Sequence, residues 1–229
     1  MILDFMTIIQ ITFSVVYLTY ISLIVIYMSI KLKELSDIER KVVNNIRLAF
    51  TALLIGDLGH VGSRLFILFA EYPTSYYGIF GIGVLLEMIG LIFLFMFYTN
   101  AWRIHFNKPN NISFKTLIGI GIFGLIIFAF PQNQWDTEPI SYEWLIIRNV
   151  PWLIQGVILS GLIIRDARIT DDPLMTRIGI VIFISFFFYM PVIFFASLEP
   201  RLGMLMIPAT ILYMLWQYFS YKRFFKNNE

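Results

Sequence analysis

The chain has no cysteine and few charged residues. Among its 229 residues, Asp, Glu, Lys and Arg together make up 14%, and there are only two histidines. The absence of cysteine excludes disulfide bonds, a thiolate nucleophile and a cysteine-ligated metal. Soluble domains carry about 25% charged residues, so the scarcity of charge argues against an ordinary soluble fold.

Sequence signatures of several enzyme classes are also missing. The chain contains no GxxxxGKS phosphate loop, no HExxH zinc motif and no GxSxG nucleophile elbow. His60 is the only histidine inside an apolar segment, so a haem held by two histidines is excluded. We therefore predict no cofactor.

Apolar residues dominate what is present. They make up 59% of the chain, which includes 23 phenylalanines. A bilayer span takes roughly 20 residues, and the apolar segments divide into seven such spans with short connections. The predicted spans are residues 5–30, 46–70, 77–102, 114–130, 144–164, 174–198 and 202–219. The sequence thus predicts an all-α integral membrane protein, with one seven-helix transmembrane domain over residues 1–229.

Basic residues are distributed unevenly between the connections. If the N-terminus lies outside, only Arg64, Arg148 and Arg201 of the 17 Lys and Arg fall on the outer half, and the other 14 fall on the inner side. Positive residues collect on cytoplasmic loops, so we predict an N-terminus outside and a C-terminus in the cytoplasm. A cell membrane is the expected location. The basic loops offer a surface for a cytoplasmic protein partner, and the net charge of +2 gives no reason to expect nucleic-acid binding.

Three ionisable residues interrupt the second apolar segment, at GDLGHVGSRLF (residues 56–66). Asp57 lies about 15 Å along a helix from Arg47 and so near the midplane, and Arg64 about 25 Å. Residues seven apart nearly coincide on a helix, so Asp57 and Arg64 share a face with His60 beside them. Because charges in a bilayer centre are costly, we expect this face to point into the bundle.

Two further segments carry polar residues at the same depth. In GIGVLLEMIG, Glu87 is flanked by Gly83 and Gly90, and RNVPWLIQG places Arg148 and Gln155 in the fifth span. We predict that Asp57, His60, Arg64, Glu87, Arg148 and Gln155 converge in a polar cavity in the outer half of the bundle. The same acids and arginines could instead form ion pairs that fix helix register. A metal site of Asp57, His60 and Glu87 is geometrically conceivable but weakly indicated.

Seven predicted spans, an outside N-terminus and YMPV at residues 189–192 resemble the microbial rhodopsins. The resemblance implies a shared architecture and no more. A retinal Schiff base needs a lysine in the seventh helix, and residues 202–219 contain none. The protein is therefore not expected to bind retinal. The third span ends in TNAWRIHF, without the acid–Arg–aromatic triplet of G-protein-coupled receptors.

Three classes of function remain open. The first, which we favour, is a receptor-like sensor rather than an enzyme, and it binds a small polar or anionic ligand from outside. The second is a proton-coupled carrier that uses Asp57, His60 and Glu87, although no inverted repeat is visible. The third is a lipid hydrolase in which an acid and His60 activate water.

Three further residues carry expectations. We expect His105 to be a solvated loop residue, and Pro191 and Pro208 to lie inside the sixth and seventh helices.

Overall fold

The structure is a computed structural model that describes residues 5–70, 76–136 and 140–226. Within these ranges the chain forms seven α-helices and no strand, which confirms the prediction of an all-α seven-helix bundle. The α-helices are α1 (Phe5–Lys31), α2 (Asp37–Phe69), α3 (Tyr77–His105), α4 (Ile112–Phe128), α5 (Tyr142–Ile169), α6 (Pro173–Phe195) and α7 (Met206–Phe225). The short 3₁₀ helices are η1 (Leu32–Glu34), η3 (Pro131–Asn133) and η4 (Pro200–Leu205).

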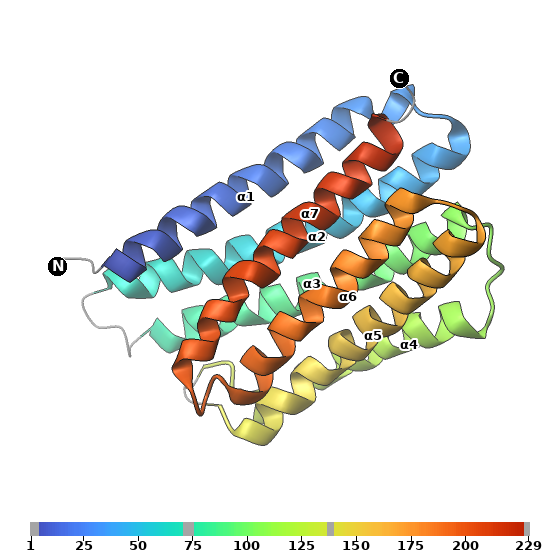
Figure 1. The fold of residues 1–229 in the computed structure, drawn as a ribbon. Coiled ribbons are helices and arrows are strands. Elements are labelled where there is room, and N and C mark those ends of the chain that lie inside the picture. The colour runs from blue at the N-terminus through green and yellow to red at the C-terminus, as the bar shows by residue number, and fades with distance from the viewer. Residues whose placement is uncertain (1–4, 71–75, 137–139, 227–229) are drawn as a thin grey trace.

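Each helix packs beside its neighbours in sequence, and α7 returns to contact α1 and α2. The helices lie alongside one another, with the two chain termini at opposite ends of the bundle (Figure 1). Helix α3 also contacts α5 and lies close to the centre. Basic side chains occur in the last turns of α1, α3, α5 and α7. We call the end at which these four helices finish the basic end.

Six of the described helices are long and apolar enough to cross a membrane. The bundle is therefore that of a multi-pass integral membrane protein. Helix α4 has 17 residues and is about 25 Å long, slightly less than the roughly 30 Å of a bilayer core. The seventh crossing and the orientation of the termini thus stay predictions.

Two helices differ from their predicted spans at the N-terminal end. Helix α2 begins at Asp37, before residue 46, because acidic residues in its first turn stabilise a helix end that continues beyond the apolar segment. Pro208 lies within the bounds of α7 as expected, but it does not interrupt the helix. It lies in the first turn of α7, where a backbone N–H has no helical partner. Pro191 lies inside α6 as predicted.

Glycines allow α2 and α3 to pack backbone against backbone. A Cβ added to Gly56 would lie 3.0 Å from the Glu87 Cα, and one added to Gly90 would lie 2.6 Å from the Ala52 carbonyl oxygen. A Cβ at Gly83 would lie 2.6 Å from the Gly59 carbonyl oxygen. Small residues at such positions permit close helix contact in membranes. This contact brings Asp57 of α2 and Glu87 of α3 into the same region.

Aromatic side chains fill the middle of the bundle. The Phe95 ring stacks on Trp152 and Trp216, with 6.4 Å and 6.0 Å between ring centres. The Tyr98 ring packs edge-on against Trp216, with 4.7 Å between ring centres. All four side chains are at most 1% exposed. Such pairs add about 0.5–1.5 kcal/mol each beyond their buried area. The phenylalanine-rich sequence thus forms a solid aromatic core between the two ends of the bundle.

The α2–α3 contact predicts that Gly90→Ala destabilises the protein, because the new methyl group overlaps the Ala52 carbonyl. We expect a loss of about 1–3 kcal/mol, seen as a lower melting temperature in detergent. The matched control is Gly62→Ala on α2, where nothing lies within 4 Å of the added Cβ. Equal melting temperatures for the two variants would contradict the predicted contact.

The topology can be tested by single-cysteine labelling, because the chain has no cysteine of its own. Asn110 and Gln132 are exposed residues that lie just beyond opposite ends of α4. In intact cells, we expect a membrane-impermeant maleimide to label Gln132→Cys and to label Asn110→Cys only after permeabilisation. Labelling of both from one side would show that α4 does not cross the membrane. Labelling in the reverse order would overturn the orientation.

Candidate functional site

Asp57 lies inside the bundle and faces α1. The Tyr17 hydroxyl donates a hydrogen bond to Asp57 Oδ2 at 2.5 Å, and Tyr17 itself is buried. Tyr189 of α6 and Tyr213 of α7 lie within electrostatic range of Asp57. Helices α1, α2, α6 and α7 thus contribute to the surroundings of this carboxylate.

Glu87 lies opposite His60, with 3.3 Å between Glu87 Oε2 and His60 Nδ1. The two atoms are close enough for an ion pair when the imidazole is protonated, but they are not aligned for a hydrogen bond. The Arg148 guanidinium lies 4.9 Å from the centre of the Trp135 ring, within electrostatic range of Glu87. Among the described residues, the buried Nε of Arg148 has no hydrogen-bond partner.

Arg64 does not join this group. It is exposed, and its guanidinium lies 3.4 Å from the Gln10 side chain of α1. The expectation that it faces the bundle interior is therefore wrong. Arg64 lies seven residues beyond Asp57 on α2, and its guanidinium is exposed beside Gln10 of α1. The long side chain can then extend to the membrane boundary.

Gln155 is fully buried, but it lies at the contact between α4 and α5 and not beside Asp57 or Glu87. Its Nε2 donates to the Leu117 carbonyl of α4 at 3.0 Å, while its Oε1 has no partner among the described residues. This arrangement joins α4 to α5. We therefore define the interior acidic site as Asp57, His60, Glu87 and Arg148, together with Tyr17.

The interior acidic site combines groups that can exchange protons and bind polar molecules. Its two carboxylates and one imidazole come from α2 and α3, and its guanidinium comes from α5. Within residues 5–70, 76–136 and 140–226, no group of three or more His, Asp or Glu is arranged to hold a metal ion. Buried polar atoms without partners usually have an ordered water or a ligand beside them. His60 Nδ1 and Arg148 Nε are such atoms.

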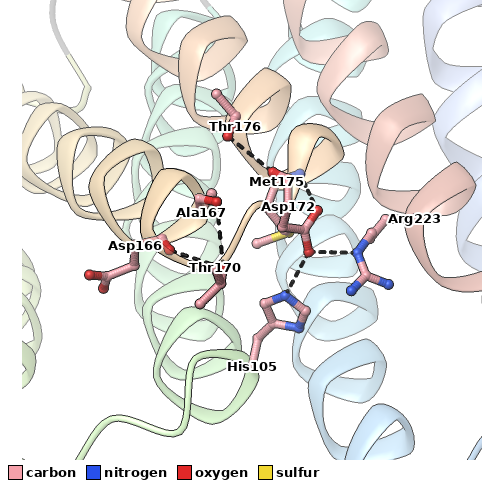
Figure 2. A network of polar contacts seen from close by, with 8 residues as sticks. All are labelled: His105, Asp166, Ala167, Thr170, Asp172, Met175, Thr176 and Arg223. Carbon is pink, nitrogen blue, oxygen red and sulfur yellow. Dashed lines mark hydrogen bonds and ion pairs between the residues drawn. The ribbon is translucent and has the colours of Figure 1, made fainter.

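A second polar cluster, which was not predicted from the sequence, lies at the basic end (Figure 2). Asp172, the N-cap residue of α6, accepts a hydrogen bond from Arg223 Nε of α7 at 2.7 Å. His105 Nε2, at the end of α3, lies 3.2 Å from the same carboxylate oxygen. The other oxygen of Asp172 accepts from the Met175 amide at 3.0 Å. One carboxylate thus joins α3, α6 and α7.

His105 is not the solvated loop residue that its position in the sequence suggests. Its side chain is only 13% exposed and packs edge-on against Phe224 of α7. Asp172 is separated from it by 67 residues, so only the folded bundle brings them together. The available signal was the D–P dipeptide at Asp172 and Pro173, which is typical of a helix start.

Asp166 forms the other buried carboxylate of the basic end. It is 1% exposed and accepts from Trp102 Nε1 at 3.0 Å and Arg165 Nε at 2.9 Å. Lys108 Nζ lies 3.2 Å from it. With an indole and two cations as partners, the negative charge of Asp166 is fully compensated, and the Trp102 contact braces α3 against α5.

The environment of Asp172 makes its stabilising effect pH dependent. Burial alone would raise the pKa of this carboxyl, but hydrogen bonds from His105, the Met175 amide and Arg223 lower the pKa below its ordinary value. A carboxyl whose folded-state pKa is depressed stabilises the fold above its unfolded pKa of about 3.9. That stabilisation is lost as the pH falls below this value towards the folded-state pKa.

We expect Asp172→Asn to lower the free energy of unfolding by about 1–3 kcal/mol at neutral pH, because Arg223 loses its charged partner. The wild type should also lose stability between about pH 5 and pH 3 more steeply than the variant. Thermal unfolding over that pH range measures both effects. The control is Asp171→Asn, an exposed neighbour with a φ of 51° that asparagine tolerates. A destabilisation as large in the control would contradict the assigned role of Asp172.

No protein-family model, curated protein or solved structure matches this chain. The fold and composition therefore define its class, an all-α multi-pass membrane protein with buried ionisable residues.

Proposed function

We propose that this membrane protein is a receptor-like sensor that binds a small polar ligand at the interior acidic site. The observation that carries the proposal is the convergence of Asp57, Glu87 and Arg148 from three helices, with the buried Nε of Arg148 unpaired among the described residues. A charge in a membrane interior costs several kcal/mol unless it is compensated. A bound ligand would supply that compensation.

The charges of the site favour a ligand that carries positive charge or donates hydrogen bonds. Two carboxylates face one permanent cation, because Arg64 lies outside the site. Asp57 has the Tyr17 hydroxyl as its only hydrogen-bond donor among the described residues. A small anion would find one permanent cation there, Arg148, beside two carboxyl groups that do not attract it. The anionic ligand considered from the sequence is therefore the weaker choice.

A proton-coupled carrier is the second candidate, and a specific contact favours it. His60 lies beside Glu87, and Glu87 lies within electrostatic range of Asp57. An imidazole next to a carboxylate can take up and release protons near neutral pH. The lipid hydrolase has less support, because the nearby Ser63 hydroxyl is not placed to act as a nucleophile activated by His60. It donates to the backbone carbonyl of His60 rather than to its imidazole.

The sensor proposal is tested by thermal unfolding of the purified protein with ethanolammonium or choline, and with acetate or phosphate as anionic comparators. We expect the cations to raise the melting temperature of the wild type. A ligand at a hundred times its Kd stabilises by about 2.7 kcal/mol. Glu87→Gln should abolish this effect, because it removes the negative charge while keeping the shape. Glu143→Gln, an exposed acid on α5, is the control and should respond like the wild type.

Three outcomes would contradict the sensor. Equal stabilisation by anions and cations would overturn the assigned ligand charge. An unchanged response in Glu87→Gln would place binding elsewhere. If no probe has an effect and Glu87→Gln loses about 3–5 kcal/mol of stability, the site is an ion-paired brace.

A further inference from the structure

Three neighbouring residues of α7 carry buried polar atoms that lack partners among the described residues. These atoms are the Tyr213 hydroxyl, the Trp216 Nε1 and both amide atoms of Gln217. Gln217 is 0% exposed, Trp216 1% and Tyr213 4%. A side-chain amide that loses both its donor and its acceptor partners in an apolar interior is costly.

These residues lie on one side of α7. Positions four and seven apart fall on the same side of a helix, so Gln217 and Ser220 follow Tyr213 along it. Ser220 is also fully buried, and its hydroxyl lies 2.9 Å from the Tyr98 hydroxyl of α3. We call Tyr213, Trp216, Gln217 and Ser220 the α7 polar face.

The α7 polar face connects two clusters of groups that can exchange protons. At one end, Tyr213 lies within electrostatic range of Asp57 and Glu87. At the other end, Arg223 follows Ser220 by one turn and contacts Asp172, which also contacts His105 (Figure 2). Tyr213 and Arg223 are about 15 Å apart along the helix.

The second cluster borders an open hollow. A depression of about 380 Å³ is lined by His105, Phe106, Asn107, Thr170, Asp172 and Arg223. Protons that reach Asp172 or His105 from the bundle interior can therefore pass to bulk water at the basic end.

Buried polar groups that lack protein partners are commonly satisfied by ordered water with two to four polar neighbours. We propose that the α7 polar face holds such water and conducts protons between the interior acidic site and the basic end. A proton enters at the partly exposed His60 and Glu87 side chains, leaves the Glu87 or Asp57 carboxyl for a water molecule and passes along hydrogen-bonded waters beside Gln217 and the Ser220–Tyr98 pair. It ends on His105 or in bulk water. Each relay gives up one proton as it accepts another.

The alternative is that water bound at Gln217 is purely structural and leads nowhere. In that case the packed aromatic rings of Phe50, Phe95 and Trp216 block the passage of protons through the bundle interior. Proton movement distinguishes the two cases, because only a continuous path carries flux. The path does not depend on whether the acidic site binds a ligand, so its test is made without one.

The experiment uses the full chain in liposomes that contain a pH-sensitive dye, with potassium and valinomycin to clamp the membrane potential. After an imposed pH step, we expect vesicles with the wild type to equilibrate at least ten times faster than protein-free vesicles. Gln217→Leu should slow this by ten-fold or more, and Ser220→Ala by several-fold. Thr99→Val is the matched control. The Thr99 and Ser220 hydroxyls are both buried and donate to a carbonyl of their own helix, but among the described residues only that of Ser220 also contacts a second hydroxyl, that of Tyr98. The control should conduct like the wild type.

Two outcomes would overturn the proposal. One is wild-type vesicles that equilibrate no faster than protein-free vesicles. The other is Gln217→Leu and Ser220→Ala protein that conducts like Thr99→Val. Size-exclusion chromatography and melting temperature establish that each variant is folded. If Gln217→Leu does not fold, the comparison of Ser220→Ala with Thr99→Val decides by the same criterion.

Discussion

The backbone contact between α2 and α3 determines where the charges of this protein can lie. Gly56 and Gly90 leave no room for a Cβ at this contact, so the two helices approach more closely than larger side chains would permit. The close approach keeps Glu87 next to His60 and within electrostatic range of Asp57. If these helices moved apart, Glu87 would lose His60 as its partner, and its charge in the membrane interior would be less compensated.

The two ends of the bundle handle buried charge differently. At the basic end, Asp166 and Asp172 each have nearby cations and at least one neutral or backbone donor. Such complete pairing is typical of carboxylates that brace a fold. In the interior acidic site, His60 and Arg148 each retain an unpaired buried nitrogen among the described residues. Incomplete pairing of this kind costs stability, which is a reason to look for function in the acidic site rather than at the basic end.

The helices could be predicted from the sequence because length and apolarity determine them locally, and the helices that carry Asp57 and Glu87 could be assigned for the same reason. Arg64 could not be placed correctly. Arg64 lies seven residues after Asp57 and so falls on the same side of α2. Whether it is buried depends on how α1 packs against that side, which the sequence does not show. His105 and Asp172 lie far apart in the chain, and periodicity carries no information about which helix ends meet. Gln155 illustrates the same limit, since its partner is a backbone carbonyl of α4 that has no sequence signature.

The aromatic core separates the acidic site from the basic end, so any communication between them must pass through it or around it. Phe95, Trp152 and Phe186 form a stacked group in which rigid rings pack with little free space. The α7 polar face runs beside this group. Its four residues are buried, and three of them, Tyr213, Trp216 and Gln217, carry polar atoms without partners among the described residues. A helix that only needed to fill the core would carry leucine or phenylalanine at position 217. A glutamine there lowers stability unless something polar lies against it, and water beside Gln217 would meet this need and provide a route along α7 between the two ends.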